Sequence, residues 1–163
     1  MNNNLLIIGA GQYGVVAKEI AQSMSVFDKI DFLDDTQGFA IGKICDCEKF
    51  CDKYAYAVVA IGNNELRLTL IDKISPFFKI ATLISPFSYV SPSAKIESGT
   101  IVEPLAVVQT NAQIGKGCLI CSGAIVKHDS VVGKGCYLDC NCVVQPRIVV
   151  NDLSKIEPCM ICD

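Results

Sequence analysis

The feature that most restricts the fold of this chain is a six-residue repeat in its second half. Every sixth residue from Val90 to Ile156 is aliphatic, with no position missed. A period of six is too long for the alternation of a single strand and does not fit the turn of about 3.6 residues in an α-helix. The repeat therefore indicates a solenoid in which each hexad contributes one flat side and one turn. The column consists of Val90, Ile96, Val102, Val108, Ile114, Ile120, Val126, Val132, Leu138, Val144, Val150 and Ile156.

A second column follows the first at a distance of four residues and contains mostly small side chains. Three hexads close one triangular coil, so the twelve hexads of residues 90–161 predict a parallel β-helix of about four coils. We expect the aliphatic column to point to its axis and the small column to let the chain turn. Glycines near the small column mark tight turns that need a positive φ. The small residues are Ala94, Thr100, Ala106, Ala112, Cys118, Ala124, Ser130, Cys136 and Cys142, and the turn glycines are Gly99, Gly117, Gly123 and Gly135.

The first half of the chain alternates strand and helix signals instead. Three short apolar runs predict strands, and apolar residues at helical spacing follow the first and third of them. Asn63 or Asn64 can cap the second helix, and Pro76 stops it. This order predicts a small α/β domain with a parallel sheet over residues 1–86, followed by the β-helix over residues 87–163.

Composition excludes several functional classes. Hydrophobic residues make up 51% and charged residues 19% of the chain, which supplies a core and excludes disorder. A net charge of -3 without a run of Lys or Arg argues against nucleic acid as a partner. No apolar stretch approaches the length of a membrane span, and the N-terminus lacks the basic start of a secretory signal, so we expect a cytoplasmic protein. The ten cysteines are then expected to be reduced thiols.

A glycine-rich loop after the first strand is the main ligand-binding signal of the first half. Gly9-Ala10-Gly11-Gln12-Tyr13-Gly14 ends a strand and opens a helix, where such glycines let backbone N–H groups approach a phosphate. The alternative is a tight turn without a ligand. Asp34 and Asp35 end the next strand, where an acidic residue commonly accepts hydrogen bonds from a ribose, although the pair also fits a solvated turn.

Asn63 and Arg67 extend this expected site. They lie four residues apart at the start of the second helix, so both can face the crevice above the carboxyl edge of the sheet. A helix cap and a solvated arginine would explain them equally well.

His128 is the only histidine of the chain and precedes Asp129. It is third in the hexad that begins at Val126, which places it outside the coil near a corner. A lone histidine is more often structural than catalytic. An imidazole beside a carboxylate nevertheless suits a general base, because the carboxylate orients the ring and stabilises the imidazolium.

The cysteines give only weak metal signals. Cys45, Cys47 and Cys51 form one short cluster, and Cys159 and Cys162 form another. No second pair lies at zinc-site spacing, and three further cysteines simply occupy the small-residue column, so we expect no metal.

The whole chain resembles the bacterial sugar acetyltransferases of the sialic-acid O-acetyltransferase and UDP-amino-sugar N-acetyltransferase group. This resemblance implies a Rossmann-like N-terminal domain joined to a left-handed β-helix, and a homotrimer packed along the flat sides of the β-helix. The similarity runs in order along the chain and is densest around His128. It includes residues 5–14, Phe32-Leu33-Asp34-Asp35, Ala60-Ile61-Gly62-Asn63-Asn64-Glu65-Leu66-Arg67, residues 89–96 and Ser122-Gly123-Ala124-Ile125-Val126-Lys127-His128-Asp129.

The resemblance also implies roles for individual residues. His128 matches the catalytic base of the family, and Asp129 matches the acidic residue that assists it. Acetyl-CoA is expected in the groove between adjacent subunits, near Tyr137 and Gly123. The N-terminal domain is expected to hold a sugar nucleotide through Gly9, Gly11, Gln12, Tyr13, Asp34, Asp35, Asn63 and Arg67.

Several positions depart from the family pattern. The family usually has a second His at the position of Tyr137, a Gly-His-Gly at the position of Gln12-Tyr13-Gly14, and a His-Pro at the position of Ser85-Pro86. The C-terminal part is also shorter than in the relatives, so we expect part of the CoA groove to be missing.

The leading expectation is transfer of an acetyl group from acetyl-CoA to the amine of a nucleotide-activated amino sugar, with His128 as general base. One alternative is O-acetylation of a free sugar such as sialic acid. Another is a non-catalytic trimer that binds a sugar nucleotide but has lost CoA binding, which the short C-terminus and Tyr137 favour.

Overall fold

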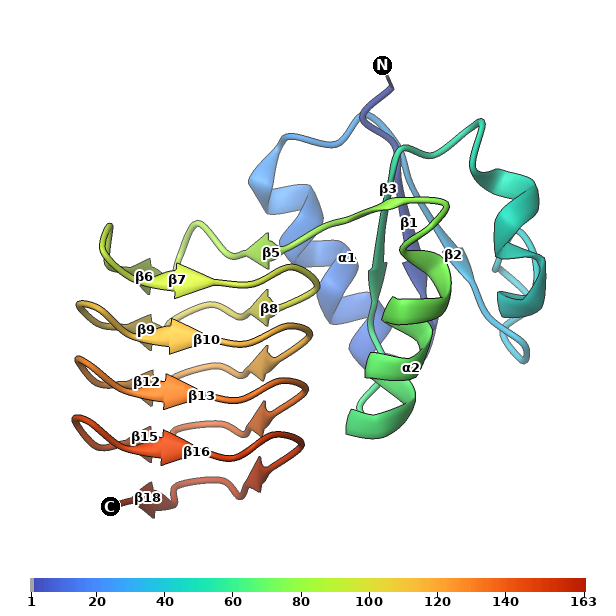
Figure 1. The fold of residues 1–163 in the computed structure, drawn as a ribbon. Coiled ribbons are helices and arrows are strands. Elements are labelled where there is room, and N and C mark those ends of the chain that lie inside the picture. The colour runs from blue at the N-terminus through green and yellow to red at the C-terminus, as the bar shows by residue number, and fades with distance from the viewer. Residues whose placement is uncertain (1) are drawn as a thin grey trace.

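The computed structural model describes residues 2–163 and shows two units packed side by side (Figure 1). The first unit is a parallel sheet with the strand order β2-β1-β3-β4, which confirms the predicted small α/β domain. No helix within residues 2–163 is long and apolar enough to cross a membrane. The elements of this unit are β1 (Leu5–Ile8), α1 (Gln12–Met24), β2 (Ile30–Leu33), the 3₁₀ helix η1 (Ile44–Phe50), β3 (Tyr56–Val59), α2 (Asn64–Ile74) and β4 (Lys79–Ile80).

Both faces of this sheet are buried, which explains why its strands are continuous apolar runs. Leu5 and Ile7 of β1 belong to the core shared with α1, whereas Leu6 and Ile8 belong to the core shared with α2 and η1. All four side chains are 0% exposed. Parallel strands that carry helices on both sides lose the alternation of apolar and polar residues.

The second unit is a parallel β-helix made of the two-residue strands β5 to β18, which form three flat faces. Face 1 contains β5, β8, β11, β14 and β17, face 2 contains β6, β9, β12, β15 and β18, and face 3 contains β7, β10, β13 and β16. The strands are β5 (Leu83–Ile84), β6 (Tyr89–Val90), β7 (Lys95–Ile96), β8 (Ile101–Val102), β9 (Val107–Val108), β10 (Gln113–Ile114), β11 (Leu119–Ile120), β12 (Ile125–Val126), β13 (Val131–Val132), β14 (Tyr137–Leu138), β15 (Val143–Val144), β16 (Val149–Val150), β17 (Lys155–Ile156) and β18 (Ile161–Cys162).

The two sequence columns take the places that the repeat predicts. The aliphatic residue is the second of each strand from β5 to β17 and points into the coil, and the small residues fill the corners of the same core. Residues one coil apart pair directly, as Val126 does with Val108. The pattern begins one hexad before the first predicted one, because β5 already belongs to face 1, so the β-helix starts ahead of the boundary expected at residue 87.

A column of glycines forms the surface on which α2 docks. Gly99, Gly117 and Gly135 occupy successive corners between faces 3 and 1, with φ values of 78°, 68° and 65°. A Cβ atom at these positions would lie 2.9, 2.7 and 2.8 Å from side-chain carbons of Ile71 or Leu68 in α2. Glycine is therefore required both for the positive φ, as the sequence predicts, and for the close approach of the helix.

Arg67 of α2 is completely buried and joins the two units. It is 0% exposed, and burial lowers the pKa of its guanidinium group, which still remains charged. Its hydrogen bonds go to five backbone carbonyl groups and one side-chain amide, and none of these six partners is a carboxylate. This corrects the expectation that Arg67 faces the crevice to bind substrate. Nε donates to Gly117 O (2.7 Å), Nη1 to Ile61 O (2.8 Å) and Gly62 O (3.1 Å), and Nη2 to Asn64 Oδ1 (2.8 Å), Gly135 O (2.8 Å) and Cys136 O (3.3 Å).

The substitution Arg67→Met should lower the free energy of unfolding by about 3 kcal/mol or more, because several buried carbonyl groups lose their donor at about 1–3 kcal/mol each. Lys73→Met, at an exposed position of the same helix, should change it by less than about 0.5 kcal/mol. Urea denaturation of both variants measures the difference. Equal stability of the two would mean that Arg67 does not hold the units together.

Candidate functional site

His128 and Asp129 lie together at the corner between β12 of face 2 and β13 of face 3, on the outside of the coil as the repeat predicts. Nδ1 of His128 is 2.8 Å from Oδ2 of Asp129. The two side chains are 44% and 43% exposed, so a ligand can reach them. They border a pocket of about 400 Å³ that Tyr89, Gln109 and Thr110 also line.

The carboxylate of Asp129 determines which nitrogen of His128 accepts a proton. A carboxylate only accepts hydrogen bonds, so the neutral imidazole donates from Nδ1 and keeps the Nε2 lone pair free. Hydrogen bonds from His128 and, second, from Asn111 lower the pKa of Asp129 below its usual value. Asp129 is therefore ionised at neutral pH and can stabilise an imidazolium after Nε2 has taken up a proton.

Two glycines of the loop after β1 are required by the turn, and a third is not. Gly9 has a φ of 100°, and a Cβ atom on Gly14 would lie 2.1 Å from the carbonyl oxygen of Gly9. Gly11 has φ -69° and ψ -171°, an extended backbone that any residue adopts. No atom lies within 4 Å of a Cβ atom built on it. Gly11 is also the N-cap of α1 and provides no side-chain cap, so the N–H groups beside it, at exposed Gln12 and at Tyr13, suit an anion.

Gly62, which follows β3, is a second position where neither the backbone conformation nor the packing requires glycine. It has no positive φ, and a Cβ atom there would meet nothing within 4 Å. Because β1 and β3 are neighbours, the two glycines lie at the carboxyl edge of adjacent parallel strands. Gly62 is not among the predicted ligand-binding residues, although a glycine shortly after a strand is the same signal as in the loop after β1. Asn63 caps α2 by accepting the N–H of Leu66 at 2.9 Å, which confirms the predicted cap, and its contact with a ligand stays a prediction.

Asp34 joins two loops, and both of its carboxylate oxygens accept hydrogen bonds within the chain. Its Oδ2 accepts the N–H of Ala10 at 2.8 Å, and its Oδ1 accepts hydrogen bonds from Thr36 and Gln37. These bonds, the one from Ala10 most strongly, lower the pKa of Asp34 to about 2. Asp34 therefore has a structural role, and its expected ribose contact stays a prediction. Asp35 is exposed and uses only Oδ1, for one backbone N–H, so it keeps an oxygen for a ligand.

Tyr13 and Tyr137, two of the positions that depart from the family pattern, contact each other. Their ring centroids are 6.5 Å apart, where α1 packs on face 1. Burial raises the pKa of both phenols, so they remain protonated.

Gly123 has a structural reason to be glycine, because its φ is 73° and a Cβ atom would lie 2.2 Å from Oδ1 of Asn141. The expected cofactor contacts of Tyr137 and Gly123 remain predictions.

Within one chain, the His128–Asp129 pair and the glycine-rich loop lie on opposite sides of the β-helix. The N-terminal unit packs on face 1, whereas the pair occupies the corner between the other two faces. In Figure 1 the loop between β12 and β13 lies on the side of the β-helix that faces away from the N-terminal unit. A site that uses both features has to combine them from two copies of the chain.

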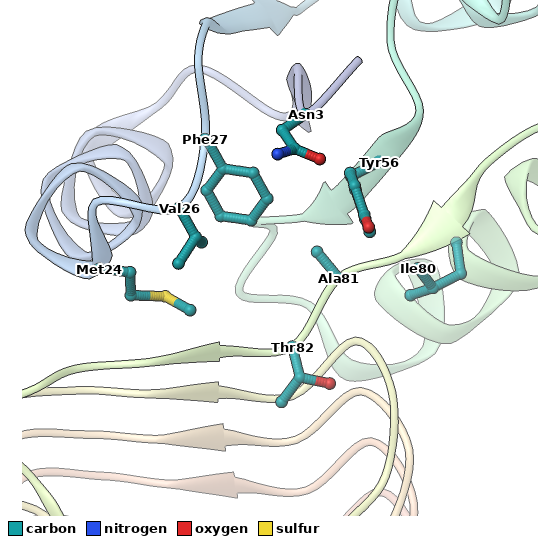
Figure 2. Close-up of a pocket in the computed structure, with 8 residues that line it drawn as sticks. All are labelled: Asn3, Met24, Val26, Phe27, Tyr56, Ile80, Ala81 and Thr82. Atoms are coloured by element: carbon teal, nitrogen blue, oxygen red, sulfur yellow. The ribbon is translucent and has the colours of Figure 1, made fainter. Parts of the chain in front are cut away.

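A second cavity, of about 420 Å³, lies at the junction of the two units near the start of β1 and β3 (Figure 2). Its lining contains no Asp, Glu, His, Lys, Arg or Cys, so it offers neither a general base nor a set of metal ligands. Within residues 2–163, no group of three His, Cys, Asp or Glu side chains is placed to hold a metal ion, and the ten cysteines are free thiols. The lining residues are Asn3, Met24, Val26, Phe27, Tyr56, Ile80, Ala81 and Thr82.

Two protein families match this chain, one in each unit. The PglD N-terminal domain matches residues 4–74, and the bacterial transferase hexapeptide repeat matches residues 93–128. The second match ends at His128 and accounts for the six-residue period.

Solved structures match nearly the whole chain. The acetyltransferase domain of PglB from Neisseria gonorrhoeae in complex with acetyl coenzyme A has a TM-score of 0.83 and 28% identity, covering 93% of this chain and 86% of that chain. A second structure of that domain has a TM-score of 0.84 and 27% identity, covering 99% of this chain and 92% of that one.

A more distant match shows the same fold. It is a mutant of GDP-perosamine N-acetyltransferase from Caulobacter crescentus in complex with CoA and GDP-perosamine, with a TM-score of 0.79 and 21% identity, covering 97% of this chain and 90% of that one. The matches confirm the Rossmann-like domain followed by a left-handed β-helix. In both of its units the chain is therefore similar to the hexapeptide-repeat sugar acetyltransferases.

Proposed function

We propose that this protein transfers the acetyl group of acetyl-CoA to the amine of a nucleotide-linked amino sugar. The observation that carries the proposal is the His128–Asp129 pair, which is 2.8 Å apart and opens into a pocket. The complexes of the matched structures with acetyl-CoA, and with CoA and GDP-perosamine, support it.

In the proposed reaction His128 first acts as base and then as acid. Nε2 removes a proton from the amine as the amine nitrogen attacks the thioester carbonyl carbon. A C–N bond forms, the C–S bond breaks, and the imidazolium returns the proton to the departing sulfur of CoA. The carboxylate of Asp129 stabilises the imidazolium between these two steps. The net change moves the acetyl group to nitrogen and one proton to sulfur.

The sugar nucleotide is assigned to the open sheet edge at Gly11 and Gly62. At both positions the space that a Cβ atom would occupy is free of protein atoms. A ligand can therefore approach the backbone closely there. The uncapped start of α1 favours the negative charge of a diphosphate. Asp35 has a free carboxylate oxygen that suits a ribose hydroxyl.

A second copy of the chain is assigned to face 2, which carries an apolar stripe that the chain itself does not cover. Face 1 carries apolar residues too, but the N-terminal unit buries most of them. A copy packed against face 2 shields the stripe and lies next to the corner of His128. Three copies that repeat this contact close a ring, which is the proposed homotrimer. The outward residues of face 2 are Tyr89, Val107, Ile125, Val143 and Ile161.

The substitution His128→Gln should reduce kcat/KM by about 10²–10⁴-fold, because it removes the proposed general base. The assay incubates the protein with acetyl-CoA and a panel of UDP-linked amino sugars, GDP-linked amino sugars and free sialic acid. Products are identified by mass spectrometry, because the free thiols of the protein would disturb an assay of thiol release. An acetylated amino sugar supports the proposal. Product from sialic acid alone would indicate O-acetylation instead, and activity that survives in the folded variant would exclude His128 as the base.

The two glycines Gly11 and Gly14 should respond oppositely to alanine. Gly11→Ala should leave the free energy of unfolding within about 0.5 kcal/mol, since the added Cβ atom meets no protein atom, but should raise KM for the sugar nucleotide. Gly14→Ala should destabilise the fold by about 1–3 kcal/mol, because its Cβ atom would overlap the carbonyl group of Gly9. Thermal unfolding and steady-state kinetics separate these effects, and an unchanged KM for Gly11→Ala would place the nucleotide elsewhere.

Mixing two inactive variants tests whether the site is shared between copies. Gly11→Glu introduces a carboxylate where the diphosphate is proposed to bind, and His128→Gln removes the base. If each site takes the loop from one copy and the base from the next, every mixed trimer regains both in about one third of its sites, that is, in one site of three. Co-expression with two different affinity tags isolates the mixed oligomers for assay. Mixed oligomers without activity would show that one chain supplies both parts.

A further inference from the structure

Asn111 contacts the oxygen of Asp129 that His128 does not use. Its Nδ2 donates to Oδ1 of Asp129 at 3.0 Å, while Oδ2 of Asp129 accepts from Nδ1 of His128 at 2.8 Å. Because a carboxylate has only acceptors, the amide must present its NH₂ group. We propose that Asn111 is a positioning residue, which holds Asp129 in the rotamer that orients the ring of His128.

The backbone fixes Asn111 directly above Asp129. The two residues are 18 apart, which is one coil, and both are at the left-handed position of the same corner, with φ values of 58° and 60°. The N–H of Asn111 donates to Oγ of Ser93 at 3.1 Å, and the N–H of Asp129 donates to the carbonyl of Thr110 at 3.0 Å. The coil repeat thus sets the distance at which the amide reaches the carboxylate.

Asp129 needs such a support because solvent surrounds much of it. Its side chain is 43% exposed, so it can rotate away from His128 unless its second oxygen is held. The backbone of His128 has another support, since its N–H donates to Oε1 of Gln109 at 3.2 Å. The ring of His128 is held at Nδ1 by Asp129, and its orientation therefore depends on Asn111.

Two substitutions remove the amide donor with different structural effects. Asn111→Gly relieves the left-handed backbone, whereas Asn111→Asp keeps the shape and sets a second carboxylate against Asp129. The matched control is Asn141→Gly, which makes the same change at a left-handed corner position, φ 57°, between faces 1 and 2.

The decisive readout is the tautomer of His128. As the only histidine of the chain, it gives the only imidazole signals in a ¹⁵N NMR spectrum of tag-free protein. At a pH where the ring is neutral, the native protein should show a protonated Nδ1 and an unprotonated Nε2. Both Asn111 variants should shift these signals toward the tautomer mixture of a free imidazole, and Asn141→Gly should not. This readout does not require turnover, so it tests the inference even if the proposed function fails.

The kinetic readout rests on the proposed function. In Asn111→Gly, kcat should fall about tenfold with little change in KM, as expected when one hydrogen bond to a charged group is lost. Asn111→Asp should lose more, because two carboxylates repel each other. Native tautomer signals in both folded variants would overturn the proposal, as would a loss in Asn141→Gly equal to that in Asn111→Gly.

Discussion

The arrangement of this protein depends on one buried arginine. Arg67 carries a positive charge into an interface where its hydrogen-bond partners are five carbonyl groups and one amide. Burial of a charge without an opposite charge is costly unless every donor is used, and here the six bonds use the whole guanidinium group. The same side chain ties the loop after β3 to the corners at Gly117 and Gly135. Asn64 continues the contact by donating to the carbonyl of Leu153 one coil further on at 2.9 Å.

This interface separates the open sheet edge of the N-terminal unit from His128 of the same chain. It holds the open sheet edge at Gly11 and Gly62 on the face 1 side of the β-helix, whereas His128 lies at the corner opposite that face. Because Arg67 ties the two units together, the N-terminal unit stays on the face 1 side, away from the His128 corner of its own chain. The proposed second copy on the apolar stripe of face 2 would overcome the separation, because it would lie beside that corner.

The sequence predicts repetitive parts of the structure well and loop contacts poorly. The six-residue period places His128 outside a corner because every hexad repeats the same local geometry. Asp34 and Arg67 are predicted to bind a ligand, but each also has protein partners far away in the chain. The partner of Asp34 is 24 residues away, and two partners of Arg67 are 50 and 68 residues away, and no local pattern reports such contacts. Asn111 could have been found, since it precedes Asp129 by 18 residues and so lies one coil above it.

The corners of the β-helix show where the chain accepts backbone strain. On the side of α2, three successive corners are glycine, because the helix leaves no room for a side chain. At the corners between faces 2 and 3 the same left-handed position holds Asn111, Asp129 and Arg147, with φ values of 58°, 60° and 63°. Glycine would relieve each of them by about 1 kcal/mol, although Asn and Asp adopt this conformation more readily than most residues. The chain therefore keeps a strained backbone at Asp129, where the carboxylate contacts the ring of His128. The hexad repeat places Asn111 one coil above, where its amide holds the other oxygen of that carboxylate.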